Sequence, residues 1–291
     1  MSVGGEADHM TIQEIDGLIE EGISLKQIAQ AYSDIANLKV RGIREAVLRN
    51  RSFFDEISKV YGIVRAFAIK KGIYLQKPKK RLDILLTSNY RFYGNINSAL
   101  INYFIGSTRE LTDVDRIIIG KGGIDFFRAT KLLKNYSELQ LLHDMPVASE
   151  LASLSRIISQ YSRVLVFHSK LKSLLNQRIT FTDLTATSFY LTEFQVKRIN
   201  IHFIFEPEVA KILSFFDSQI LTLLLEQTFL ESELSRNASR FVSMDQAQIE
   251  ADKFVREYQR LKTSKKLILG NLKILENFAT LMAVKKEQNV Q

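Results

Sequence analysis

A glycine-rich turn is the strongest candidate for chemistry in this sequence. Gly120, Lys121, Gly122 and Gly123 follow a β-rich run and precede a helical pattern. At such a position, backbone N–H groups at a helix N-terminus can bind phosphate. Their spacing matches neither the P-loop nor the dinucleotide-binding fingerprint, and Asp125 near the helix start would cap the helix and repel a phosphate. The pattern therefore favours a structural turn over a nucleotide site.

Other residue types that commonly carry chemistry are isolated from one another. The four histidines are His9, His143, His168 and His202. No pair of them has the i, i+4 or HExxH spacing of a helical metal site. The absence of Cys excludes thiolate catalysis, disulfides and Cys-ligated zinc, and it favours an intracellular location. With no nucleophile elbow and no paired carboxylates either, we expect no catalytic residue, no metal and no cofactor.

The charge balance predicts an acidic partner without naming it. Lys and Arg number 40 against 32 Asp and Glu, for a net charge of +8 and a pI near 9.4. Basic residues concentrate in residues 39–51 and 77–81, where they could contact phosphates. The aromatic platforms and loop signatures of RNA-binding modules are missing, and coiled-coil flanks are ordinarily basic. These features argue against nucleic acid, and the charge alone leaves anionic lipid and an acidic protein surface as the remaining interpretations.

The composition is that of a globular, water-soluble chain. Hydrophobic residues make up 46% and charged residues 25% of the sequence, which is close to ordinary globular usage. No apolar run approaches the roughly 20 residues needed to span a bilayer. The N-terminus lacks the basic start and long apolar centre of a secretory signal. We expect a protein without a transmembrane segment.

Proline positions divide the chain into three segments. Pro78 ends a long proline-free stretch, Pro207 begins another in what we expect to be a first helical turn, and Pro146 lies between them. The predicted domains are residues 11–77, an N-terminal coiled-coil helix; residues 78–206, a central α/β domain; and residues 207–285, a C-terminal helix that pairs antiparallel with the first. At 1.5 Å per residue the two helices would be roughly 100 and 115 Å long.

Helical periodicity supports these outer segments. Apolar residues of the first segment step by three, four or seven between Ile43 and Ala68, and those of the last follow a near-heptad pattern between Leu234 and Met282. Glycine weakens a helix by about 1 kcal/mol relative to Ala. We expect a helix break near Gly22, and bending or close approach of a partner at Gly42 and Gly62.

The middle segment alternates β-rich runs with helical patterns, which is typical of a mainly parallel, Rossmann-like α/β sheet. The predicted strands are residues 82–87, 116–119, 163–167, 179–182 and 199–205, the last being a candidate edge or antiparallel strand. The predicted helices are residues 97–105, 124–133 and 148–161.

This architecture and four local strings resemble the gamma subunit of F-type ATP synthases, from Thr11 to about Lys285. The strings are residues 24–41, residues 87–94 with Asn97, residues 119–122 with Phe126 and Phe127, and residues 231–247. The last string is the most specific, with Glu231, Ser235, Ala238, Arg240, Val242, Met244 and Ala247 at positions of the family's C-terminal helix signature.

The resemblance implies a non-catalytic rotor shaft inside a ring of alpha and beta subunits. Such a shaft would touch the epsilon subunit and the membrane c-ring, and it would lie peripherally at the cytoplasmic face of the cell membrane. It would couple ATP synthesis or hydrolysis to ion transport, including hydrogen ion transport, with catalysis left to the beta subunits. The alternatives are the shaft of a diverged F-type-like motor, or a stand-alone nucleotide-binding α/β module with a coiled-coil arm.

The resemblance also implies where the ring would be touched. The candidate contacts are Lys26, Tyr32, Lys39, Arg41, Arg240, Lys266 and Leu267. An equally good interpretation of Tyr32 is packing within the coiled coil. We expect Arg240→Ala to slow or uncouple ATP hydrolysis by the assembled complex while the folding of the isolated chain hardly changes.

Several positions depart from the family pattern. Tyr32 replaces the usual Met, and Asn89 replaces an Asp. Lys266 and Leu267 stand where the family has an Arg-Gln pair, which keeps one charge and loses the neighbouring hydrogen-bonding group. Further along the same helix, Lys273 puts a base where the family has an acid.

Overall fold

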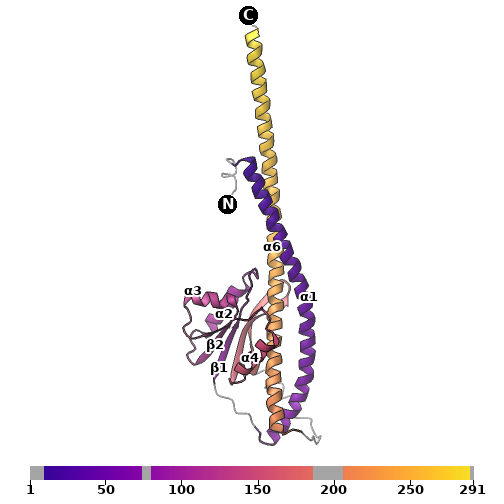
Figure 1. Ribbon diagram of the computed structural model, residues 1–291, viewed down its shortest axis with the longest axis vertical. Helices are drawn as coiled ribbons and strands as arrows, with labels where there is room; N and C mark the ends of the chain where they lie inside the picture. Colours follow the sequence, from indigo (N-terminus) through magenta and orange to yellow (C-terminus); the bar gives the residue numbers. More distant parts are fainter. Residues whose placement is uncertain (1–9, 74–79, 186–205, 289–291) are drawn as a thin grey trace. The chain divides into compact units, whose positions relative to one another are not determined.

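The structure is a computed structural model that describes residues 10–73, 80–185 and 206–288, with side chains up to Met282. It contains two compact units, Met1–Ser33 with Met244–Gln291, and Asp34–Ser243. Two long helices, α1 (Ile12–Lys70) and α6 (Val209–Gln288), contribute to both units (Figure 1). The long terminal helices of the predicted fold class are therefore present.

The larger unit contains a five-stranded sheet in the order β3-β2-β1-β4-β5. Its strands are β1 (Arg81–Leu86), β2 (Val114–Ile119), β3 (Ser137–Leu139), β4 (Arg163–Ser173) and β5 (Asn176–Asp183). The first four strands in this order pair in parallel, and β5 runs antiparallel to β4. The mainly parallel sheet expected from the sequence is confirmed.

Most of the predicted elements of this unit are present. The strands predicted at 82–87, 116–119, 163–167 and 179–182 correspond to β1, β2, β4 and β5. The three predicted helices correspond to α2 (Ile96–Thr108), α3 (Lys121–Thr130) and α4 (Ala148–Ile158). Strand β3 was not predicted, because its three residues carry no apolar alternation. The strand predicted at 199–205 lies outside the described residues.

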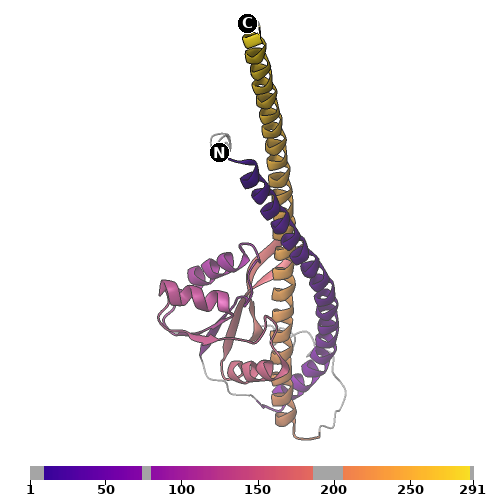
Figure 2. The ribbon, with the colours of Figure 1, turned by 45° about the horizontal axis from the view of Figure 1, so that its top comes forward.

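The sheet is covered on both faces, which explains why its central strands carry buried apolar residues that point to either face. Leu82, Ile84 and Leu86 of β1 belong to a core cluster that α1, α4 and α6 share. Leu85 of β1 belongs to a second cluster, built with α2 and α3, in which Phe104 packs edge-on against Phe167 at a centroid distance of 5.1 Å. Figures 1 and 2 show α2 and α3 on one side of the sheet and α4 on the other.

Within the smaller unit, the two helices pair antiparallel. Asp16 forms an ion pair with Lys262, and Lys26 forms one with Asp252, so the partner number falls as the α1 number rises. Gly22 lies between these pairs, and a Cβ there would be 2.9 Å from Phe254 and 2.7 Å from Val255. Glycine at this position therefore allows close approach of the two helices.

Two expectations about the helices were wrong in detail. Helix α1 is continuous through Gly22, because the close packing there compensates for the weak helix propensity of glycine. At Gly42, where bending or close approach of a partner was expected, a Cβ would meet nothing within 4 Å, and bending there stays a prediction. Pro207 precedes the first residue of α6, Val209, rather than lying in its first turn. The domain boundaries at residues 77–78 and 206–207 stay a prediction.

Candidate interaction surface

The predicted ring-contact residues near the start of α1 already have neighbours in the chain. The Lys26 Nζ lies 2.5 Å from the Asp252 Oδ1, and this hydrogen bond lowers the pKa of the Asp252 carboxyl. Tyr32 is partly buried and also interacts within the chain. Lys26 therefore joins α1 to α6, and a role at the ring for either residue stays a prediction.

Further along α1, two basic candidates are more accessible. The half-exposed Lys39 ammonium lies 3.9 Å from Glu233 of α6, which leaves most of its hydrogen-bonding capacity open. Arg41 is exposed, and within the described residues no ion pair or hydrogen bond engages its side chain. Of the predicted contacts on α1, Arg41 is therefore the one best placed to meet another chain.

Arg240 is placed differently, because its side chain is only 5% exposed. Its guanidinium lies over the Tyr93 ring at 3.9 Å from the centroid and donates a 2.8 Å hydrogen bond to the Arg91 carbonyl oxygen. The neighbouring Ser239 hydroxyl donates to the Tyr93 carbonyl oxygen at 2.8 Å. Arg240 thus holds the loop after β1 against α6. The expectation that its removal would hardly affect folding stays a prediction, and these contacts argue against it.

The segment of α6 that carries the family-like string is polar and buried. Its buried polar residues are Ser232, Glu233, Ser235, Arg236, Asn237, Ser239 and Arg240. Arg236 donates to Glu233 at 3.0 Å and to the Ser232 hydroxyl at 3.0 Å. Asn237 donates to the Glu233 carboxylate at 2.8 Å. The polar network lies beside the buried apolar residues Leu234 and Ala238 of the same segment.

Both members of the central ion pair are charged. Burial favours the neutral form of Arg236, but the Glu233 and Asp144 carboxylates outweigh this effect and raise the pKa of its guanidinium. Burial likewise acts to raise the pKa of Glu233, but Arg236 and Asn237 outweigh it and lower that pKa. The two directions agree, so each charge depends on its partner for stabilisation in the interior.

The glycine turn before α3 has its backbone donors already in use. The Lys121 N–H donates to the Asn89 side-chain oxygen, the Gly122 N–H to the Ser88 carbonyl oxygen and the Gly123 N–H to the Thr87 hydroxyl, each at 2.9 Å. A phosphate at this helix N-terminus would need these same donors. The turn is structural, and Gly120 adopts a φ of +94° in it.

The hydrogen bonds of Asn89 explain why an amide side chain suits the loop after β1. Its side-chain nitrogen donates to the carbonyl oxygens of Leu141 at 3.1 Å and of His143 at 3.0 Å, while its oxygen accepts from Lys121. A carboxylate could accept but not donate. The amide nitrogen of Asn89 is therefore matched by two carbonyl partners.

Exposed apolar residues of the smaller unit are concentrated on the last part of α6. We call residues 267–282 the apolar tip. Its exposed apolar residues are Leu267, Ile268, Leu269, Leu272, Ile274, Leu275, Phe278, Leu281 and Met282. At about 100° per residue they cover roughly two thirds of the helix circumference. A helix this apolar on most of its faces is normally buried.

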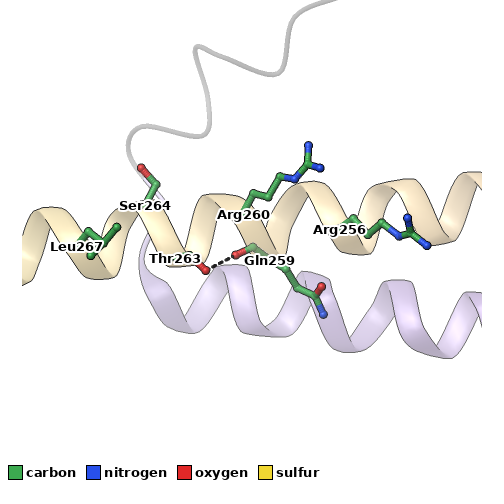
Figure 3. A pocket seen from close by; sticks show the side chains of 6 residues that line it. All are labelled: Arg256, Gln259, Arg260, Thr263, Ser264 and Leu267. Atoms are coloured by element: carbon green, nitrogen blue, oxygen red, sulfur yellow. Dashed lines mark hydrogen bonds between the residues drawn. The ribbon is translucent and has the colours of Figure 1, made fainter.

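A shallow hollow of about 510 Å³ lies just before the apolar tip. Figure 3 shows that the residues around it all belong to α6: Arg256, Gln259, Arg260, Thr263, Ser264 and Leu267. The Arg256 guanidinium is paired with Asp252 at 2.8 Å, and the Arg260 side chain points away from α1 in this view. Leu267, a predicted ring contact, is 64% exposed, and Lys266 beside it is exposed too.

Sequence reasoning identified Lys266 and Leu267 but not the remainder of the apolar tip. The near-heptad pattern was interpreted as one stripe that faces the first helix. Leu269, Ile274, Phe278 and Leu281 lie off that stripe and are exposed. A helical projection of residues 267–282 contains this signal, because its apolar residues do not fall on a single face.

Two further properties concern the described residues only. No group of three or more His, Cys, Asp or Glu residues among them could hold a metal ion. None of their helices combines the length and the apolar character that crossing a membrane requires.

Comparisons with known proteins agree on one family. The family model described as ATP synthase matches residues 11–265. The ATP synthase gamma chain of Pelotomaculum thermopropionicum is 26% identical over 238 residues, which cover 77% of this chain and 81% of that protein. The gamma chain of Stenotrophomonas maltophilia is 22% identical over 261 residues, covering 85% and 90%.

Solved structures share the fold. A chain of the Euglena gracilis mitochondrial ATP synthase rotor matches with a TM-score of 0.58 at 16% identity, covering 88% of this chain and 99% of that one. A chain of the Tetrahymena thermophila mitochondrial ATP synthase central stalk and c-ring matches with a TM-score of 0.54 at 18% identity, covering 76% and 99%. Since the family model spans most of the sequence, this chain belongs to the ATP synthase family, and the curated relatives compared with it are gamma chains.

Proposed function

We propose that this chain is the central-stalk rotor subunit of a rotary F-type ATPase and transmits torque between a catalytic alpha and beta ring and a membrane rotor. The observation that carries the proposal is the apolar tip of α6, whose side chains are between 48% and 68% exposed. Fully burying one Leu, Ile, Phe or Met side chain contributes about 1.5–3 kcal/mol. A tip that is apolar on most faces gains most from a partner that surrounds it.

The antiparallel pairing of α1 and α6 supports the same function. A shaft that carries torque must resist twisting, and two paired helices do so better than one. The ion pairs of Asp16 with Lys262 and of Lys26 with Asp252 join the two helices in the smaller unit. In the larger unit, the Tyr61 hydroxyl donates to the Asp217 carboxylate between the same two helices.

The proposed partners follow from family membership and from the names of the similar proteins. They are the alpha and beta subunits of the catalytic hexamer, the epsilon subunit and the membrane c-ring. The chain would be non-catalytic, with catalysis in the beta subunits, and would lie peripherally at the cytoplasmic face of the cell membrane. The stand-alone nucleotide-binding alternative loses its main support, because the backbone donors of the glycine turn are already bonded.

Co-purification of the tagged chain with its partners tests the proposal. We expect alpha and beta subunits in threefold excess over this chain, together with ATPase activity in the eluate. The variant Ile274→Glu/Phe278→Glu places charges on the apolar tip and should abolish recovery of the ring. The control Leu175→Glu changes an exposed residue of the β4–β5 hairpin and should leave recovery intact.

Two results would refute the rotor function. One is a parent chain that recovers only itself. The other is a tip variant that recovers an active ring as well as the parent does.

A further inference from the structure

A heptad seam on α6 continues past the point where α1 begins. Residues of this α6 seam alternate in spacing between four and three, which keeps them in one line facing a neighbouring helix. They are Phe254, Tyr258, Leu261, Lys265, Ile268, Leu272, Leu275, Ala279 and Met282. The first four are partly buried, and the last five are exposed. The α6 seam therefore has two halves with different surroundings.

Helix α1 covers the first half of the α6 seam. Gly22 of α1 lies against Phe254, whose ring would be 2.9 Å from a Cβ at that glycine. The Lys265 ammonium donates to the Met10 carbonyl oxygen, just before α1 begins at Ile12. The beginning of α1 thus coincides with the change from partly buried to exposed residues. The second half of the seam continues the α1–α6 interface without α1.

The exposed half of the α6 seam has the character of a helix-packing surface. Four of its residues, Ile268, Leu272, Leu275 and Met282, are between 50% and 64% exposed. The fifth, Ala279, is small and permits close approach of another helix, and none of the five is charged. Covering such a line of side chains removes apolar area from water. Its continuity with the α1–α6 interface indicates a second helix, packed antiparallel to α6 as α1 is.

A second copy of this chain supplies such a helix. The segment before α1, residues 1–9, does not continue the apolar spacing of α1, and Gly4 and Gly5 within it disfavour a helix. The second copy, by contrast, presents an exposed seam of the same length and character. A two-fold axis, which makes one surface complementary to itself, is the commonest symmetry of soluble oligomers.

We propose that the free chain forms a dimer in which the exposed halves of two α6 seams pack antiparallel, centred near Leu275. In a parallel pair, the α1 helices of both copies would compete for the same space beside the first half of the seam. In an antiparallel pair, each α1 lies beyond the opposite end of the overlap. Ile268 of one copy then lies opposite Met282 of the second copy, because both are seven residues from Leu275.

The dimer is expected to be weak. The overlap from residue 268 to residue 282 is about 21 Å long, and it buries less than the roughly 1,600 Å² of a standard interface. We expect a Kd of about 1–10 μM. The ring would take the same residues, so self-pairing and ring binding exclude each other. That exclusion rests on the proposed function, whereas the dimer does not.

The mass of the purified full chain tests the dimer, measured by sedimentation from about 0.5 to 100 μM. The parent should change from monomer to dimer across this range. Leu272→Glu/Leu275→Glu places charges on the α6 seam and should raise the dimer Kd about a hundredfold or more. The control Ile274→Glu/Leu281→Glu places the same charges on the opposite face of the apolar tip. It should leave the dimer Kd within about threefold of the parent.

The orientation of the dimer can be tested by cross-linking, because the chain contains no Cys. The variants Ile268→Cys and Met282→Cys should each give little disulfide-linked dimer alone. A mixture of the two should give a disulfide between one variant and the other, since a disulfide needs Cα atoms within about 7 Å. Only the antiparallel overlap brings residue 268 of one copy that close to residue 282 of the second.

Four results would overturn the dimer. The parent stays monomeric at the highest concentration, the control loses the dimer together with the seam variant, or each Cys variant alone forms disulfides as readily as the mixture. The fourth is a chain that dimerises only after residues 1–9 are removed, which would assign the seam to that segment. Each of these results leaves the rotor function standing, because recovery of the ring tests that separately. A dimer that persists in the ring-bound complex would refute the exclusion.

Discussion

Two segments of α6 reverse the usual relation between polarity and burial. Residues 231–240 are rich in polar side chains and buried, and Arg236 there is only 1% exposed. Residues 267–282 are mostly apolar and exposed, and Leu281 there is 68% exposed. Both segments belong to one continuous helix. Helix propensity therefore cannot explain the difference.

The difference lies in where each segment finds its partners. The buried polar segment finds them within the chain: Arg236 pairs with Glu233, and Arg240 stacks on Tyr93. The apolar tip has no such cover among the described residues of its own unit. The buried polar residues here indicate contacts within the chain, whereas the exposed apolar residues indicate a contact with another chain. The predictions below separate these two roles by stability and by binding.

The largest effect is expected at the buried ion pair. Arg236→Met leaves the Glu233 carboxylate buried without its strongest partner, which should lower the free energy of unfolding by about 3–5 kcal/mol. Chemical denaturation of the isolated chain measures this. Glu233→Gln/Arg236→Met should recover much of the loss, because the amide oxygen can still accept from Asn237. Equal losses in the single and double variants would show that the charge itself is unimportant.

The pH dependence of the unfolding free energy tests a second buried group, His168 of β4, whose charge would interact with Glu231 of α6. Burial lowers the pKa of His168 from 6.5 to about 4, against the opposing influence of Glu231. The unfolded chain therefore binds a proton first as pH falls. Stability conferred by the neutral imidazole is fully present above pH 6.5 and decreases as pH falls through that value towards 4, by about 3 kcal/mol.

His168→Gln isolates this contribution. The amide cannot titrate and can still bond to the Thr182 hydroxyl, which lies 2.8 Å from the His168 Nε2. The difference in unfolding free energy between parent and variant should change by about 3 kcal/mol between pH 7 and pH 4. A constant difference across this range would contradict a buried neutral histidine.

Arg240→Ala should have a smaller effect, of about 2 kcal/mol. The variant loses the cation–π contact with Tyr93 and the hydrogen bond to the Arg91 carbonyl oxygen. Arg240→Lys keeps the charge but not the planar fork and should be intermediate. Thermal unfolding of the isolated chain provides the measurement. An unchanged midpoint in Arg240→Ala would support the original expectation that this residue acts only at the ring.

The fold was largely predictable because its signals are local. Proline positions and apolar periodicity indicated the two long helices, and the apolar runs of β1, β2 and β4 indicated buried parallel strands. Strand β3 was missed because edge pairing of three residues needs little apolar side-chain area. The break expected at Gly22 failed because Phe254 and Val255 pack there, and such a long-range contact leaves no local signature.

The interaction surface was predictable only in part. Position and charge indicated Lys39 and Arg41, which are exposed. The same reasoning placed Arg240 at the ring, although the structure buries it against Tyr93. A buried arginine and an exposed one look alike in a helical sequence, because only the tertiary neighbours differ. The family resemblance identified the string around Arg240. It did not show whether these residues pack within the chain or contact another chain.

The smallest effect on stability is expected at the apolar tip, which completes the comparison. Ile274→Ser/Leu275→Ser replaces two exposed apolar side chains, so the unfolding free energy of the isolated chain should change by less than about 1 kcal/mol. The same variant should bind the ring much more weakly, because the lost apolar contact matters only in the complex. Denaturation and binding measured on one preparation distinguish the two effects. A large loss of stability with unchanged binding would mean that the tip packs within the chain, as residues 231–240 do.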